Sequence, residues 1–172
     1  GGYASSTVLM CPTRRYHGLL VAVPSGSIKR HVFLGRFEES VHARGIHFPL
    51  SIARYAPGRW FPYGHEVFES FALVPYPSVT FRIGGAHIVR ELLLVRGQQT
   101  VLCRYALADP DEALELDLRP LVPFREADGT VTALSPESVA PPGQVGEAGT
   151  GAVHAAGNAL RAYPLLAARL AE

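Results

Sequence analysis

The sequence predicts an all-β protein, built as an antiparallel β-sandwich, from three observations. Short apolar or alternating runs recur through the first two-thirds of the chain. Glycine and proline, 17 and 14 of the 172 residues, separate these runs. No long stretch shows the 3.6-residue period of an amphipathic helix. Many short strands without helices pack as sheets face to face; a barrel fits the same pattern, which alone does not choose between the two.

Turn residues bound the strands of the first half. Residues 18–23 form an apolar run that ends at Pro24 and a Ser-Gly-Ser turn. Residues 31–34 resume with β-forming side chains, and residues 48–55 form a third run that ends at Ala-Pro-Gly. Such runs between turn residues are typical of strands, so each is predicted as one strand.

A hairpin is the clearest feature of the second half. Residues 68–74 run into Pro-Tyr-Pro, and residues 78–83 and 87–95 then flank Gly84-Gly85. Both glycines tolerate positive φ, which the tightest hairpin turns require. The sequence therefore predicts that the two flanking segments pair as antiparallel strands.

Two alternating segments follow the hairpin. Residues 100–107 place Val, Cys, Tyr and Leu on one face, and residues 114–118 alternate leucine with charged side chains. The second pattern indicates a strand with one buried and one wet face. An Asp-Pro-Asp turn at 109–111 separates the two. Cys103 lies on the apolar face and is predicted to be a buried thiol, because free cysteine packs as a small hydrophobe.

Composition divides the chain into three parts. Residues 1–134 form the β-sandwich domain, and residues 135–152, rich in Pro, Gly, Ala and Ser, are predicted as a linker. Residues 153–172 are rich in Ala, Leu and Arg, which is compatible with a short C-terminal helix. Gly157 would weaken that helix and Pro164 would break or kink it.

Charge and hydropathy exclude several classes of protein. The formal net charge of +1 offers no electrostatic footprint for nucleic acid. No run of about 18 apolar residues could span a membrane, and no secretory signal pattern opens the chain. Two cysteines far apart in sequence do not make a disulfide framework. A cytoplasmic location is therefore expected.

A block of polar residues precedes the first long apolar run. Arg14, Arg15, Tyr16 and His17 stand together just before Gly18. Guanidinium groups can donate hydrogen bonds to sugar hydroxyls, and the rings can stack on a sugar face. The alternative is that these groups fix strand ends or a surface for a partner domain. Both interpretations stay open on the sequence.

A second aromatic cluster lies in the middle of the chain. Tyr55, Trp60, Phe61 and Tyr63 are interspersed with proline and glycine. Stiffened aromatic loops suit carbohydrate stacking, but they equally cover one end of a sandwich. Trp60 and Tyr63 therefore join the block at 14–17 as candidate residues for substrate binding or a domain interface. The remaining aromatic side chains are expected in the core; these are Phe71, Phe81, Tyr105 and Phe124.

No acid pair suited to catalysis emerges from the sequence. Glycoside hydrolysis uses two carboxyl groups about 5–9.5 Å apart. Glu38 and Glu39 are adjacent on a strand and face opposite sides, and all the acidic groups, these two included, are interpreted as solvated surface residues. The seven histidines lack the spacing of a zinc motif. No catalytic residue, metal or cofactor is therefore predicted.

Several segments in order resemble a known family. Residues 1–8 read GGYASSTV and residues 13–20 read TRRYHGLL. This opening resembles the N-terminal domain of bacterial and archaeal glycogen debranching enzymes, the amylo-α-1,6-glucosidases. Residues 71–77, 92–100 and 114–121 are similar to later segments of the family, so the resemblance covers about residues 1–125. Residues 125–128 read READ, where the family usually has a Tyr-His pair.

The resemblance implies a fold, a role and a partner. The fold is a supersandwich of the galactose-mutarotase-like kind. The role is a non-catalytic N-terminal domain, and the partner is a helical domain that hydrolyses α-1,6-glucosidic bonds in α-glucans. A stand-alone carbohydrate-binding module and a mutarotase-like sugar-acting enzyme are the alternatives. A further alternative is an interaction domain that forms homo-oligomers through an exposed face.

Overall fold

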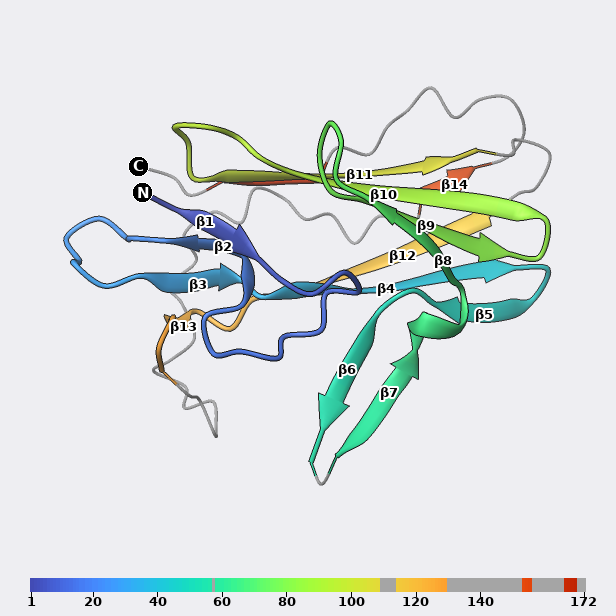
Figure 1. Ribbon diagram of the computed structural model, residues 1–172, viewed down its shortest axis with the longest axis horizontal. Coiled ribbons are helices and arrows are strands. Elements are labelled where there is room, and N and C mark those ends of the chain that lie inside the picture. Colours follow the sequence, from blue (N-terminus) through green and yellow to red (C-terminus); the bar gives the residue numbers. More distant parts are fainter. Residues whose placement is uncertain (57, 109–113, 130–152, 156–165, 170–172) are drawn as a thin grey trace.

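The computed structural model confirms the all-β class (Figure 1). It describes residues 1–56, 58–108 and 114–129, together with the backbone of two strands at 153–155 and 166–169. Within these residues one 3-10 turn, η1 (Gly64–Glu66), is the only helical element. No helix in this part of the chain is long and apolar enough to cross a membrane.

One layer of the sandwich is a five-stranded antiparallel sheet in the order β15-β11-β10-β9-β8. Its strands are β8 (Phe68–Ala72), β9 (Ser78–Ile83), β10 (Ala86–Leu94), β11 (Thr100–Leu107) and β15 (Leu166–Arg169). β9 and β10 pair across Gly84-Gly85, as the sequence predicts, and Gly84 has a φ of 61°. This sheet lies along the upper part of Figure 1.

Two four-stranded antiparallel sheets complete the sandwich. One has the order β14-β12-β4-β5, with β4 (Arg36–Ala43), β5 (Ile46–Pro49), β12 (Leu114–Leu121) and β14 (Val153–Ala155). The other has the order β1-β2-β3-β13, with β1 (Tyr3–Ser5), β2 (Gly18–Ala22), β3 (His31–Leu34) and β13 (Arg125–Glu126). In the view of Figure 1, β2, β3, β4 and β5 of these sheets lie below β10 and β11. The remaining strands, β6 (Ile52–Tyr55) and β7 (Arg59–Tyr63), form a separate two-stranded hairpin.

The core lies between the layers in two main clusters. One joins β4 and β9 through side chains such as Val41 and Phe81, which are fully buried. The other joins β2 and β11 through Leu20 and Tyr105. Burial of Phe81 and Tyr105 is thus confirmed. Burial of this apolar surface supplies the main driving force for folding.

Two aromatic side chains depart from their expected burial. Phe71 is 41% exposed, because β8 is the last strand of its sheet and no described strand pairs with its outer side. Phe124 is only half-buried, and it stacks beside His31 and contacts Phe33. Cys103 is buried as predicted, and both cysteines are free thiols.

Residues 153–155 and 166–169 of the tail are extended, whereas residues 156–165 and 170–172 of the segment expected as a short helix lie outside the described residues. Within 153–172 the described residues form strands: β14 pairs with β12, and β15 pairs with β11. An edge strand has unpaired backbone N–H and C=O groups that can bond to a further strand. Pairing with β12 and β11 therefore favours the extended conformation at residues 153–155 and 166–169 over a helix. The expected linker at 135–152 and the expected turn at 109–111 lie outside the described residues. The division at 134 stays a prediction.

The strands of residues 36–63 also differ from expectation. The expected single strand over 48–55 is two strands, β5 and β6, separated at Leu50 and Ser51. The sequence analysis placed Glu38 and Glu39 on a strand without predicting the bounds of β4, and β7 was not expected. β4 reads RFEESVHA, whose charges hide its alternation, and β7 reads RWFPY, whose proline suggests a loop. Neighbouring strands supply the backbone partners that make both segments extended.

Candidate functional site

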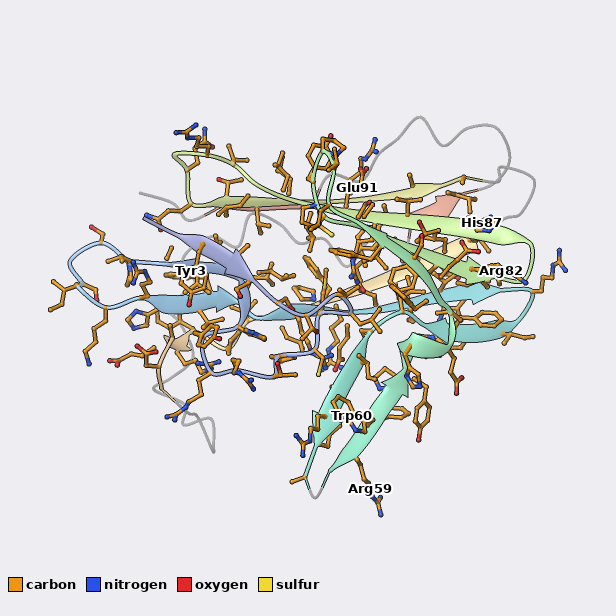
Figure 2. The ribbon with its side chains drawn as sticks, viewed as in Figure 1. Tyr3, Arg59, Trp60, Arg82, His87 and Glu91 are labelled. Carbon is orange, nitrogen blue, oxygen red and sulfur yellow. The ribbon has the colours of Figure 1, made fainter. Side chains whose placement is uncertain are left out.

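The hairpin of β6 and β7 projects away from the sandwich (Figure 1). We call it the aromatic arm. Four of its rings are strongly exposed: Tyr55 by 48%, Trp60 by 43%, Phe61 by 60% and Tyr63 by 50%. Figure 2 shows Arg59 and Trp60 on the arm, distant from the labelled residues of the five-stranded sheet. Trp60 and Tyr63, two of the residues singled out in the sequence, therefore lie exposed on this projecting hairpin.

The base of the arm is fixed by hydrogen bonds to backbone carbonyl groups. The Gly64 N–H donates to the Ser51 carbonyl at 3.1 Å, and the Arg36 guanidinium donates to the Ile52 carbonyl at 3.1 Å. The Leu50 N–H donates to the Glu39 carbonyl at 2.9 Å. Gly64 is buried so tightly against Leu50 and Ser51 that no side chain fits. The arm thus has a rigid base and a free end.

The two faces of the arm carry different side chains. Arg54 pairs with Trp60 across the strands, so both lie on one face, and the guanidinium stands 5.8 Å from the indole centroid. Tyr55 pairs with Arg59 on the opposite face, which Phe61 also shares by the alternation of the strand. Each face therefore combines one arginine with at least one aromatic ring.

The polar block at 14–17 lies in the connection between β1 and β2. Its side chains are exposed except for His17, which is half-buried. The backbone of the block is held from two sides: Arg125 donates to the Arg15 carbonyl at 2.5 Å, and the Tyr3 hydroxyl donates to the Tyr16 carbonyl at 2.9 Å. The scaffold therefore presents this block as an ordered surface loop.

Within the block, the polar contacts are local. His17 accepts a hydrogen bond from the Thr13 N–H at 3.2 Å on Nδ1, and its ring contacts Tyr16 edge-on. Arg14 donates to the Thr13 carbonyl at 3.2 Å. Within the described residues no hydrogen bond or ring contact joins this block to the aromatic arm. The sequence candidates thus form two separate surfaces.

A buried polar network lies inside the sandwich, and the sequence reasoning missed it. The Glu39 carboxylate accepts a hydrogen bond from Arg90 at 2.5 Å on Oε2 and one from the Tyr105 hydroxyl on Oε1. Arg90 also donates to the Val8 carbonyl at 2.6 Å, and its guanidinium lies over the ring of Phe81 at 5.2 Å. All three members of the network are buried.

The expectation that Glu39 is a solvated surface acid is therefore wrong. The residues of β4 that point inward are Phe37, Glu39, Val41 and Ala43, so the glutamate is in phase with apolar neighbours. That alternation was the available signal. Glu38 faces the other way, and it accepts from Arg36 at 3.0 Å and pairs with Arg119 at 3.5 Å. The two glutamates cannot act together on one substrate.

Burial governs the protonation of this network. Removal from water is the largest single influence on Arg90 and lowers its pKa, but the charge and hydrogen bond of Glu39, together with smaller effects of Tyr105 and Cys103, raise the pKa of Arg90 on balance. Burial, and then the charge of Glu39, raise the pKa of Tyr105 well above 10 and the pKa of Cys103 to about 12. Arg90, Tyr105 and Cys103 therefore all keep their protons through neutral pH, unlike a catalytic acid or base, which must exchange protons.

These shifts predict a loss of stability in alkali. Below pH 9 the Cys103 thiol is protonated in both the folded and the unfolded chain. Above its ordinary pKa of 9.0 the unfolded thiol ionises, whereas the folded thiol holds its proton up to about pH 12. The free energy of unfolding should therefore fall as pH rises from 9 towards 12, and Tyr105 should add to the fall above pH 10.

Urea titrations at several pH values would measure this fall. In the Cys103→Ala variant the decline that begins near pH 9 should become shallower, because one of the two groups is gone. An unchanged free energy of unfolding between pH 8 and pH 11 in the unaltered protein would contradict the assignment.

Two further carboxylates pair with histidines at the surface. His42 pairs with Asp117 at 2.9 Å, and His87 pairs with Glu69 at 3.5 Å. All four side chains are at least 37% exposed. Among the residues that the structure describes, no group of three histidine, cysteine, aspartate or glutamate side chains could hold a metal ion.

Comparison with known proteins adds one finding. A family model described as glycogen debranching enzyme N terminal matches residues 1–163. The match covers the polar block, the aromatic arm, the buried network and β14. No curated protein and no solved structure matches the chain.

Proposed function

Because the chain belongs to the glycogen debranching enzyme N-terminal family, we propose that it is the non-catalytic domain of such an enzyme. It supports the hydrolysis of α-1,6-glucosidic bonds in α-glucans by a separate helical catalytic domain. The observation that carries the proposal is the family match over residues 1–163. A cytoplasmic location fits this role in glycogen metabolism.

The chemistry of the described residues supports a non-catalytic role. Glu39 is the only carboxylate buried in this part of the chain, and Arg90 and Tyr105 occupy its two oxygens. A general acid for glycoside hydrolysis must instead reach the bridging oxygen of the substrate. Glu38, its neighbour in sequence, faces away and is bound by arginines.

The two exposed surfaces are the natural places for contact with a partner or a glucan. The polar block presents Arg14, Arg15, Tyr16 and His17 on a loop with a held backbone. The aromatic arm presents Trp60 and Tyr63 on a projecting hairpin. Ordered, exposed polar and aromatic groups on a rigid β-scaffold are common at binding sites.

An assay of sugar release tests the proposal. The purified chain should release no glucose from a branched limit dextrin. When it is added to the helical catalytic domain of a debranching enzyme, produced as a separate polypeptide, it should bind that domain and raise its rate of glucose release. Glucose release by the chain alone, or no complex with the helical domain, would overturn the proposal.

A stand-alone carbohydrate-binding module is the second candidate, and the exposure of Trp60 and Tyr63 favours it. In that case the chain would bind maltoheptaose without any partner, and the Trp60→Ala variant would lose this binding. The titration with maltoheptaose included in the experiment below decides between the two candidates.

A further inference from the structure

We propose that the aromatic arm inserts into an acidic groove of a protein partner. The inference rests on the proposed function, in which that partner is the helical catalytic domain. Beyond that function, the inference specifies the element of this chain that makes the contact and the side chains that the partner must present. The partner's groove would carry carboxylates to face the arginines and apolar side chains to cover the rings.

The first step is that the outer part of the arm has exposed side chains on both faces, whereas Ala53 nearer its base is buried. Among the residues that the structure describes, the two strands of the arm pair only with each other. Arg54 and Trp60 are exposed on one face, and Tyr55, Arg59 and Phe61 are exposed on the other. A lone two-stranded hairpin is only marginally stable in water. A groove could bury the rings on both faces of the arm, whereas a flat surface could bury the rings on only one face.

The second step is the charge of the arm. Residues 52–63 contain Arg54 and Arg59 and no acidic residue. Both arginines are exposed, and they lie on opposite faces. Positive charge on both faces is complementary to carboxylates on both walls of a groove, and such complementarity selects partners and accelerates association. Arginine beside aromatic rings is also the composition that protein interfaces favour.

The third step is that the rings do not form a platform for a glucan. The rings of Phe61 and Tyr63 meet at 85°, and those of Tyr63 and His65 meet at 72°. The Arg54 guanidinium stands over Trp60 on its own face of the arm. A sugar chain stacks on rings that lie flat and open, and a neutral α-glucan gains no Coulomb energy from two arginines. These observations favour a protein partner over a carbohydrate.

The fourth step is the rigid base of the arm. Gly64 and Ile52 tie the two ends of the hairpin to Ser51 and Arg36. Leu50 is in turn bonded to Glu39, which belongs to the buried network. A preorganised element loses less conformational entropy on binding than a flexible loop does. The arm is therefore held in position before the partner arrives.

Charge reversal on the arm tests the inference. The affinity of the chain for the helical catalytic domain would be measured by calorimetry at about 0.05 M and about 0.5 M salt, a range over which exposed charges become screened. The variant Arg54→Glu/Arg59→Glu should bind at least about tenfold more weakly at low salt, because like charges would then face each other. The unaltered chain should lose affinity as salt rises, and the variant should lose less.

Arg96→Glu is the matched control. Arg96 is exposed in the connection between β10 and β11, outside the arm, and its reversal should change affinity by less than about twofold. Circular dichroism would verify that each variant keeps its β-structure. A second probe is maltoheptaose, titrated into the unaltered chain and into Trp60→Ala.

The outcomes separate the inference from the function on which it rests. Equal binding by the arm variant and the unaltered chain would overturn the inference and leave the proposed function intact. Absence of any complex with the unaltered chain would overturn both. Binding of maltoheptaose that disappears in Trp60→Ala would show that the arm holds a glucan instead. The inference would be supported if binding of the unaltered chain weakens with salt and if Arg54→Glu/Arg59→Glu, but not Arg96→Glu, loses that binding.

Discussion

Replacing Arg90 with methionine should lower the free energy of unfolding by about 3–5 kcal/mol, the usual cost of breaking a buried ion pair from one side. Arg90 donates to Glu39 and to the Val8 carbonyl inside the sandwich. Methionine fills much of the same space but leaves the carboxylate buried without its cation. The Tyr105 hydroxyl alone cannot offset that loss, because a buried charge needs both a counter-charge and hydrogen bonds.

Urea unfolding followed by circular dichroism measures this effect. Arg96→Met is the matched control, since it makes the same change at an exposed position, and it should shift stability by no more than about 0.5 kcal/mol. A loss for Arg90→Met as small as that of the control would show that the ion pair does not hold the layers together.

The double variant Glu39→Met/Arg90→Met separates the ion pair from the packing around it. Removal of both charges leaves no unpaired ion in the core, so the double variant should be more stable than Arg90→Met alone. If it is instead less stable, by the sum of two independent losses, then the packing of these side chains matters more than their charge.

Gly64→Ala should cost about 3 kcal/mol, at the upper end of the range for overpacking. A methyl group at Gly64 would lie 2.4 Å from the Leu50 carbonyl carbon and 2.5 Å from the Ser51 oxygen. Both are backbone atoms, so no side chain can rotate away to make room. The base of the aromatic arm would have to separate from the sandwich, and the hydrogen bond from Gly64 to Ser51 would be lost.

Trp60 is the only tryptophan of the chain, and it lies on the arm. Its fluorescence therefore reports the arm, whereas circular dichroism reports all the sheets. Gly85→Ala is the control, because nothing lies within 4 Å of the added methyl group, and it should change stability by less than about 0.5 kcal/mol. Fluorescence and stability of Gly64→Ala that match those of the control would contradict the tight base of the arm.

The sequence by itself determined the fold class and most of the sheet elements. The hairpin at Gly84-Gly85 follows from local turn chemistry, and the strands around Val21, Phe81 and Tyr105 follow from apolar runs or alternation. These signals are local, because a strand with a buried face repeats every two residues wherever it lies. The opening motif also identified the family, which the match over residues 1–163 confirmed.

Tertiary structure alone decided which polar groups are buried and which aromatic groups are not. Glu39 is buried because Arg90 and Tyr105, 51 and 66 residues away along the chain, meet it between the sheets. Phe71 is exposed because its strand ends a sheet. The alternation of β4 could place Glu39 on the inward face, but it could not supply Arg90 and Tyr105, which make burial of a charge possible. The pairing of residues 153–155 and 166–169 with β12 and β11 likewise depends on strands distant in sequence.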